Sequence, residues 1–148
     1  MVCLGNVCRS PIAHGVLDKL NKDKRLDGQL EVGSAGTGNF HLSESPDTRA
    51  INAALAREYD LNRQRARQNN ASDYESFDLV LAMDKSNLSD LRERCPSHLG
   101  QKLGLFLRGS QSGLEEVSDP YWSGPLSFEL VLNLAKEVYA PLIDEFVN

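Results

Sequence analysis

Cys3 and Arg9 are separated by five residues near the start of the chain, and Ser10 and Pro11 follow the arginine directly. Serine is a good N-cap and proline suits the first helical position, so we expect a helix to begin here. Its free amides and positive dipole end would face the loop, as they do in sites that bind phosphate. Arg9 adds a planar guanidinium, which can hold two phosphoryl oxygens at once.

The residues between the thiol and the arginine suit a loop that wraps around an anion. Gly5 and Asn6 tolerate the left-handed conformations that a nest of inward-pointing amides needs. We expect phosphate to be bound by Leu4, Gly5, Asn6, Val7, Cys8, Arg9 and Ser10.

Cys3 would lie where these dipoles converge. Helix N-termini and nearby cations favour the thiolate, which is the nucleophilic form of cysteine. The hydroxyl of Ser10 could donate a hydrogen bond to this thiolate and ease its departure from a thiophosphate. The pattern therefore predicts nucleophilic attack on phosphorus by Cys3.

Cysteine has other common uses in proteins. A lone cysteine is usually a small buried hydrophobic residue, which is our expectation for Cys95. Cys3, Cys8, Cys95 and His98 could in principle bind zinc, but that leaves the glycine, the arginine and the serine of the loop unexplained. We expect no metal and no cofactor.

Composition is typical of an ordinary globular domain spanning residues 1–148, with 41% hydrophobic and 25% charged residues. The net charge of −5 and the lack of a basic stripe argue against nucleic-acid binding.

There is no apolar run long enough to span a membrane, and the start does not resemble a signal peptide. Three cysteines, an odd number, argue against a secreted disulfide framework. A cytoplasmic location is expected.

Hydrophobic periodicity predicts alternating strands and helices. We expect strands ending at Met1-Val2 and over 30–32, 79–82 and 102–107, and helices over 11–26, 46–59, 84–94 and from 125, with a kink or break at Pro141. Ser72 and Glu75 suggest a capping box for a further short helix, and His14 reads as a surface or capping residue.

This alternation indicates an α/β fold: a single three-layer domain of the flavodoxin-like or Rossmann-like type, with a central four-stranded parallel sheet and helices on both faces. Ligands bind at the carboxyl ends of such strands, where Cys3 lies after the first strand.

The segment from Val2 to Pro11 resembles the phosphate-binding loop of the low-molecular-weight protein tyrosine phosphatases, and the resemblance extends over nearly the whole chain. Further matches in order are Ser34-Ala35-Gly36-Thr37-Gly38, Pro46-Asp47, Ala66-Arg67-Gln68, Ala82-Met83-Asp84, Ser86-Asn87-Leu88 and Asp119-Pro120-Tyr121.

The resemblance implies hydrolysis of phosphotyrosine in proteins, and of small aryl phosphates, through a phosphocysteine. Cys3 would be the nucleophile, Arg9 the phosphate ligand and Asp119 the general acid, aimed by Pro120, which restricts the residue before it. The family resemblance also suggests that Phe40, Tyr121 and Trp122 form the walls of the substrate cleft.

Loop support is assigned by the same resemblance to Asn6, Ser10, Ser34 and Gln64. Gln64 stands where the family more often has a histidine that bonds the loop asparagine, here Asn6, and its amide could still donate that bond. Cys8 could form a disulfide with Cys3 after oxidation, or be a buried structural thiol.

Two rival functions remain open at this point. Arsenate reductases of similar fold share the loop but use two further cysteines downstream, where this chain has only Cys95. A phosphotyrosine-binding module with a decayed site is the non-enzymatic alternative. The expected partner is a phosphotyrosine-containing protein, and the expected state is a monomer or weak dimer.

Overall fold

The computed structural model describes residues 1–26, 28–122 and 125–147. Four parallel strands form one sheet in the order β2-β1-β3-β4, which confirms the predicted sheet. The strands are β1 (Val2–Cys3), β2 (Ala35–Gly36), β3 (Val80–Ala82) and β4 (Leu103–Leu105). β1 is central, since Val2 is paired with Ala35 on one side and with Ala82 on the other.

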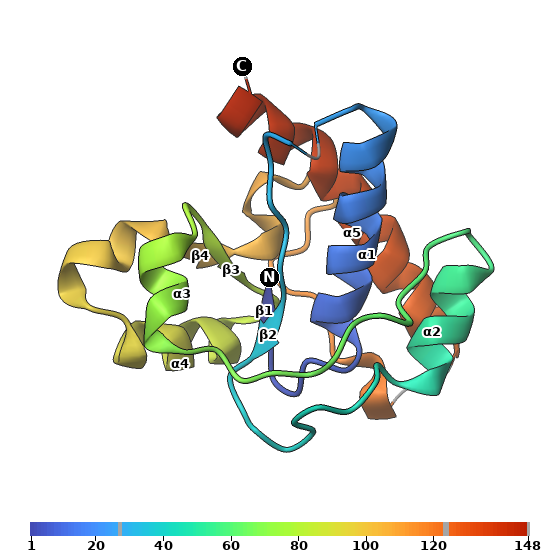
Figure 1. Ribbon diagram of the computed structural model, residues 1–148, viewed down its shortest axis with the longest axis horizontal. Coiled ribbons are helices and arrows are strands. Elements are labelled where there is room, and N and C mark those ends of the chain that lie inside the picture. The colour runs from blue at the N-terminus through green and yellow to red at the C-terminus, as the bar shows by residue number, and fades with distance from the viewer. Residues whose placement is uncertain (27, 123–124, 148) are drawn as a thin grey trace.

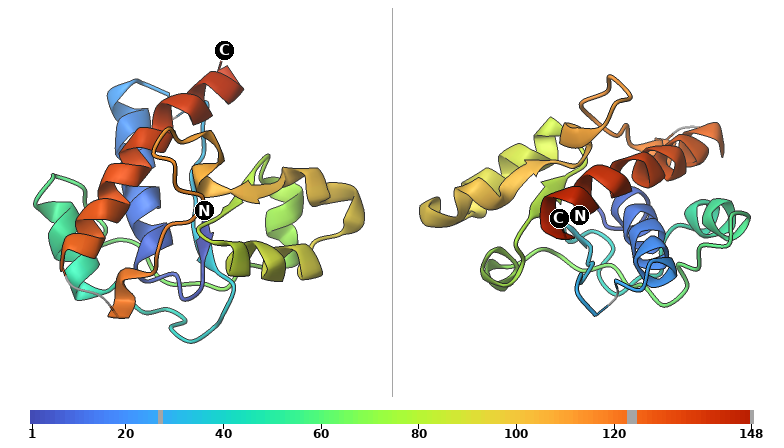
Figure 2. Two further views of the ribbon diagram at one scale, coloured as in Figure 1. Left: turned by 180° about the vertical axis from the view of Figure 1, so that it is seen from behind. Right: turned by 90° about the horizontal axis from the view of Figure 1, so that it is seen from above.

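Helices cover both faces of this sheet (Figures 1 and 2). The group of α1 (Arg9–Asp23), α2 (Thr48–Leu55) and α5 (Pro125–Val147) lies together on one side, and α3 (Ala71–Ser76) and α4 (Lys85–Arg94) lie on the other. Short 3-10 turns span Ser97–Lys102, Phe106–Gly109 and Pro120–Trp122. None of the helices in the described ranges is long and apolar enough to cross a membrane.

Alternation along the strands divides the core into two clusters. Cys3 and Leu81 face the larger cluster, together with α1 and α5, whereas Val2, Val80 and Ala82 face the smaller cluster beside α4. The nucleophile candidate therefore belongs to the larger of the two hydrophobic clusters.

The first helix begins and ends earlier than predicted. α1 starts at Arg9, with Cys8 as its N-cap, and stops at Asp23 instead of Leu26. Ser10 is thus inside the first turn, so the predicted N-cap was wrong. The consequence is functional, because the Ser10 hydroxyl bonds Cys3 in the loop and the Ala35 carbonyl on β2 instead of capping the helix.

Two other helix starts are also corrected. α2 begins at Thr48, not at Pro46, because the Asp47 side chain accepts a hydrogen bond from the Arg49 amide and caps it; it ends at Leu55 rather than Tyr59. The capping box of α3 is formed by Asn70 and Asp73, two residues before the pair predicted, Ser72 and Glu75. α4 begins at Lys85, one residue after the predicted start, and Asp84 is its N-cap.

Strands and the last helix differ from prediction in extent. Residues 30–32 are not in a strand, and β4 ends at Leu105, where a 3-10 turn follows. α5 continues through Pro141 without the predicted interruption. Phe146, which lies near the end of α5, is 43% exposed.

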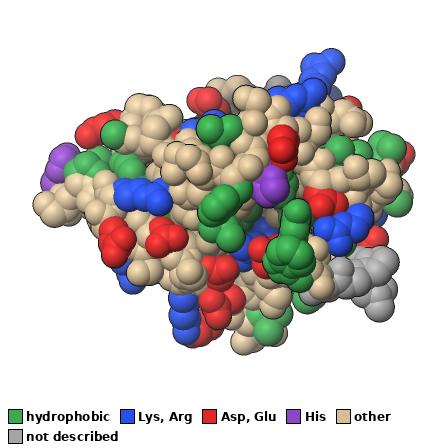
Figure 3. Space-filling model, turned by 90° about the horizontal axis from the view of Figure 1, so that it is seen from below, with side chains coloured by type: hydrophobic (Ala, Val, Ile, Leu, Met, Phe, Trp, Pro, Cys, Tyr) green, Lys and Arg blue, Asp and Glu red, His purple; other side chains and the backbone are tan. Residues whose placement is uncertain are grey.

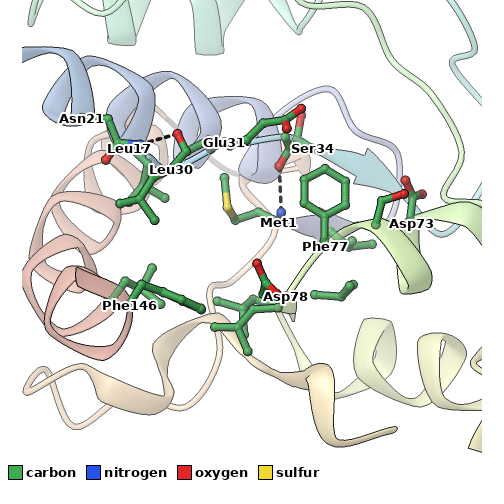
Figure 4. A pocket seen from close by; sticks show the side chains of 18 of the residues that line it. Met1, Leu17, Asn21, Leu30, Glu31, Ser34, Asp73, Phe77, Asp78 and Phe146 are labelled. Carbon is green, nitrogen blue, oxygen red and sulfur yellow. Dashed lines mark hydrogen bonds between the residues drawn. The ribbon is translucent and has the colours of Figure 1, made fainter. Parts of the chain in front are cut away.

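A cavity of about 360 Å³ continues the line of β1 beyond Met1, between the segment leading to β2 and the segment leading to β3 (Figure 4). Its apolar lining includes Leu17, Leu30 and Phe77. The amine of Met1 lies at its edge and donates a hydrogen bond to the Gly33 carbonyl at 2.9 Å. The centre of the sheet is thus incompletely filled at the amino end of β1, whose other end leads into the loop that carries Cys3.

Candidate active site

The phosphate loop, defined here as residues 3–10, follows directly from β1. Asn6 is left-handed, with φ of 56°, as predicted, but Gly5 does not have a positive φ. Close approach is instead required at Gly36 on β2, where an added Cβ would lie 2.6 Å from the Leu4 carbonyl oxygen. The loop therefore rests against a glycine of the neighbouring strand.

The thiol of Cys3 is buried at the base of this loop, with 3% of the residue exposed. The Asn6 amide donates to its Sγ at 3.3 Å, and the Ser10 Oγ lies 3.1 Å from the same sulfur. The contact predicted between Ser10 and Cys3 is therefore present. The Asn6 amide is thus a donor to the sulfur, and the single hydrogen of the Ser10 hydroxyl can point to the sulfur or to the Ala35 carbonyl at 3.2 Å. Such donors stabilise negative charge on the sulfur.

Arg9 is held in place by acceptors from distant parts of the chain. Its Nη1 donates to Asp84 Oδ2 at 2.6 Å and to the Val117 carbonyl at 3.0 Å, and its Nη2 is 3.5 Å from Asp119 Oδ2. Only 2% of Arg9 is exposed. A buried guanidinium needs such compensation, since an unpaired buried charge is strongly destabilising.

Asp119 lies just before the 3-10 turn of Pro120–Trp122. Its Oδ1 accepts a hydrogen bond from the Tyr121 amide at 3.0 Å, while its Oδ2 is the atom near Arg9. About a third of this side chain is exposed. The carboxyl is thus fixed in orientation but open to the pocket.

The turn that carries Asp119 is tied to α2 by Arg49. The Arg49 Nη2 donates to Asp47 Oδ2 at 3.0 Å and to the Tyr121 carbonyl at 2.9 Å. Hydrogen bonding to this guanidinium lowers the pKa of Asp47, which keeps the carboxylate charged. Neither Asp47 nor Arg49 was predicted as a site residue, although Pro46-Asp47 was one of the matching motifs.

A pocket of about 310 Å³ brings together the predicted residues. It is lined by Cys3, Leu4, Gly5, Val7, Cys8, Arg9, Phe40, His41, Asp119, Tyr121 and Trp122. Phe40 and Trp122 are 70% and 87% exposed, so they project from the surface at its rim. Hydrophobic, acidic and histidine side chains crowd the middle of this side of the molecule (Figure 3).

The family model for low molecular weight phosphotyrosine protein phosphatases matches residues 1–147. The chain belongs to this family. It is similar to the mouse low molecular weight phosphotyrosine protein phosphatase, with 36% identity over 88% of this chain and 83% of the relative. It is 34% identical to YfkJ of Bacillus subtilis, over 91% of this chain and 86% of the relative.

Solved structures of family members are similar in fold. A protein tyrosine phosphatase from Entamoeba histolytica, crystallised with Hepes in its active site, has a TM-score of 0.93 and 32% identity, covering 97% of this chain and 92% of that one. A Vibrio cholerae phosphatase has a TM-score of 0.91 and 33% identity, covering 99% of this chain and 94% of that one. The flavodoxin-like α/β fold predicted from the sequence is confirmed.

Within this phosphatase fold, Asn6 connects the loop to two other segments. Its Oδ1 accepts from the Arg67 amide at 3.0 Å, and its Nδ2 donates to Ser10 Oγ at 2.8 Å and to Ser34 Oγ at 3.1 Å. Asn6, Ser10 and Ser34 thus have the contacts expected of loop supports.

The prediction for Gln64 was wrong in its partner. Gln64 Nε2 donates to the Pro11 carbonyl at 2.9 Å, and its Oε1 is 3.4 Å from Ser34 Oγ, so it reaches Asn6 only through Ser34. His14 was expected on the surface, yet its Nδ1 lies 3.2 Å from the same Ser34 oxygen. The spacing of residues along the helix could not predict this contact, because Ser34 lies 20 residues later in the chain.

Two further site residues were missed. Asp84 caps α4 with one carboxylate oxygen and bonds Arg9 with the other. It directly follows the buried run that ends at Met83, and a polar residue at the carboxyl end of a parallel strand is a sequence signal for a binding site. His41 lines the pocket, bonds Glu44 through Nδ1 at 2.7 Å and has its ring 6.0 Å from that of Tyr121. The one sequence signal for His41 as a pocket residue was its position next to Phe40, which was predicted to line the cleft.

The three cysteines differ in surroundings, and all are free thiols. Cys8 is buried beside Cys3 in the larger cluster, and burial, with Asp47 and Asp119 nearby, raises its pKa far above the usual range. Cys95 packs against the smaller cluster. Across the described residues, no group of three or more His, Cys, Asp or Glu is placed to hold a metal ion.

Proposed function

We propose that this protein hydrolyses phosphotyrosine in proteins, and small aryl phosphates, through a phosphocysteine intermediate on Cys3. The proposal is carried by one observation: a thiol, a buried guanidinium and a carboxyl, from Cys3, Arg9 and Asp119, line the same pocket. Family membership supports the same reaction.

In the first step the Cys3 thiolate attacks phosphorus. The loop amides and the Arg9 guanidinium hold the phosphoryl oxygens and stabilise the charge that develops on them. The Asn6 amide and the Ser10 hydroxyl, both within hydrogen-bonding range of Sγ, keep the resting thiolate stable. The same contacts help the sulfur to leave in the second step.

Asp119 protonates the phenolic oxygen as it departs. The Tyr121 amide, bonded to Oδ1, leaves Oδ2 to face the reaction. In the second step the same carboxylate removes a proton from water, which attacks the phosphocysteine and releases phosphate. The Arg9 Nη2 lies 3.5 Å from Asp119 Oδ2, which places the phosphate-binding guanidinium and the proton donor on the same side of the pocket.

The depth of the pocket favours phosphotyrosine over phosphoserine. Cys3 lies at the buried base, whereas Phe40 and Trp122 are on the exposed rim, so a long aromatic side chain reaches the sulfur better than a short one. Tyr121 and Trp122 pack edge to face with centroids 4.8 Å apart and form one wall for the substrate ring.

The decisive experiment measures release of phosphate from an aryl phosphate by the wild type and by Cys3→Ser. We expect the wild type to be active in the presence of a chelator and inhibited by vanadate, and the variant to be inactive while keeping its fold by circular dichroism. Cys95→Ser is the matched control and should remain active.

Hydrolysis by Cys3→Ser would show that the assignment of Cys3 as the nucleophile is wrong, and absence of turnover in the wild type would favour a binding module. Activity on arsenate with thioredoxin would indicate a reductase.

Three free cysteines suit a reducing compartment, which supports the cytoplasmic location that we propose for this enzyme. We further propose that it acts as a monomer or weak dimer on phosphotyrosine-containing proteins and that Cys8 protects the oxidised nucleophile.

A further inference from the structure

His14 contacts the support of the phosphate loop without lining the substrate pocket. It lies on α1, and its Nδ1 is 3.2 Å from the Oγ of Ser34, the residue just before β2. Both residues are half-buried. The mechanism proposed above uses neither the ring nor its proton.

Ser34 is two hydrogen bonds away from the reactive sulfur. Its Oγ accepts from Asn6 Nδ2 at 3.1 Å, and the backbone amide of Asn6 donates to Cys3 Sγ at 3.3 Å. Asn6 Nδ2 also donates to Ser10 Oγ, which itself lies 3.1 Å from the sulfur. A change at Ser34 therefore reaches Cys3 through Asn6.

The hydroxyl of Ser34 has one hydrogen and two candidate acceptors. Because Asn6 Nδ2 can only donate, the hydrogen must point to His14 Nδ1 at 3.2 Å or to Gln64 Oε1 at 3.4 Å. Gln64 is fixed in that orientation by the bond from its Nε2 to the Pro11 carbonyl. Neutral His14 can accept at Nδ1, whereas protonated His14 can only donate there.

We propose that His14 is a positioning residue for the phosphate loop, acting through Ser34 and Asn6. The neutral ring accepts the Ser34 hydroxyl. Protonation turns that hydroxyl to Gln64 and makes the Ser34 oxygen accept from both His14 and Asn6, which weakens its hold on Asn6. Only the expected effect on kcat and KM rests on the proposed function; the hydrogen-bond change at Ser34 and Asn6 does not.

Groups from several elements set the charge of His14. Burial is the largest cause and lowers the pKa of the ring below its usual 6.5, and the Met1 ammonium and Arg67 act in the same direction. Asp18, on the same helix, and the hydrogen bond with Gln64 oppose this shift. The ring is consequently neutral at neutral pH and takes up its proton only in acid.

The first test follows the side-chain amide signals of Asn6 by NMR while the wild type is titrated from pH 8 to pH 4.5. We expect these signals to shift with the same midpoint as the His14 ring, and to lose that step in Ser34→Ala. Asn6 signals that do not respond to the His14 titration would overturn the proposal. The measurement requires no turnover, so it is decided separately from the proposed function.

The second test compares pH profiles of kcat and KM on an aryl phosphate. Loss of one hydrogen bond in His14→Ala should lower kcat about threefold to tenfold, with a smaller change in KM. In His14→Asn, Oδ1 replaces the Nδ1 acceptor, so the rate should recover while the acid-side step attributable to His14 disappears. His98→Asn, at an exposed position, is the matched control and should keep the wild-type profile. Superimposable profiles for the wild type and His14→Ala would refute the role; if that variant does not fold, the NMR titration decides.

Discussion

Asp84 bonds Arg9 and caps α4 at the same time. Its Oδ2 accepts from Arg9 Nη1 at 2.6 Å, and its Oδ1 accepts from the Asn87 amide at 2.7 Å. One carboxylate thus links the guanidinium that we assign to phosphate binding with the helix that follows β3. The position of the arginine depends on a residue 75 positions later in the chain.

Replacing Asp84 should separate these two tasks. Asp84→Asn retains an oxygen that can cap α4 but leaves Arg9 without its main counter-charge, which should destabilise the protein by about 3 kcal/mol. Asp84→Ala should lose about 1 kcal/mol more, because the cap is removed as well. Urea unfolding measures both values. Equal stability of Asp84→Asn and the wild type would show that the ion pair does not hold the arginine.

Asp119→Asn should make hydrolysis depend more strongly on the leaving group. An amide cannot protonate the departing oxygen, so the loss of kcat should be about 100-fold to 10,000-fold for a poor phenolic leaving group and smaller for a nitrophenol. Single-turnover kinetics on a series of aryl phosphates checks this. The same loss for all leaving groups would argue against a general acid at this position.

The cavity beyond Met1 predicts stabilisation by an N-terminal extension. Four apolar residues joined before Met1 can continue β1 between the segments that flank the cavity, which buries apolar surface and removes the ammonium at its edge. We expect the melting temperature to rise by several degrees. An extension of four glycine and serine residues is the control, and an equal rise with that control would contradict the filling of the cavity.

The same amine should make stability depend on pH. Burial lowers the pKa of the Met1 amine from 8.0 to about 6, so the unfolded chain binds more protons than the folded one between these values. Above pH 8 the amine is neutral in both states and does not oppose folding. The free energy of unfolding should therefore fall by up to about 2 kcal/mol as the pH drops from 8 toward 6. Urea unfolding across this range should show the slope in the wild type and a smaller slope in an N-terminally acetylated sample.

Oxidation by peroxide should be reversible only while Cys8 is present. Cys8 is buried in the same loop as Cys3, and its raised pKa keeps it a thiol until the nucleophile is oxidised. Dithiothreitol should restore activity to the oxidised wild type but not to oxidised Cys8→Ser. Equal recovery of both proteins would exclude the protective role.

Local chemistry made much of this protein predictable. The motif from Cys3 to Pro11, Asp119 before a proline, and the buried run before Asp84 are short-range patterns, because loop geometry and strand burial depend on neighbouring residues. The first of these patterns indicated the phosphate loop, whereas the four-stranded parallel sheet was inferred from the alternation of strands and helices, and Asp119 and the walls of the pocket from the family resemblance. Cap positions were less predictable, because several nearby residues can cap a helix. Asn70 caps α3 in place of the predicted Ser72, and Asp47 caps α2, which was predicted to begin at residue 46.

Only the tertiary structure decided the contacts between segments that are far apart in the chain. The pairing of Arg9 with Asp84, the reach of Gln64 to Pro11 and the approach of His14 to Ser34 depend on how the helices are laid on the sheet. A hydrogen bond requires its atoms to meet within about 3 Å, and no periodicity in the sequence encodes that distance. The sequence determined which groups we propose for the chemistry, and packing decided which partners hold them.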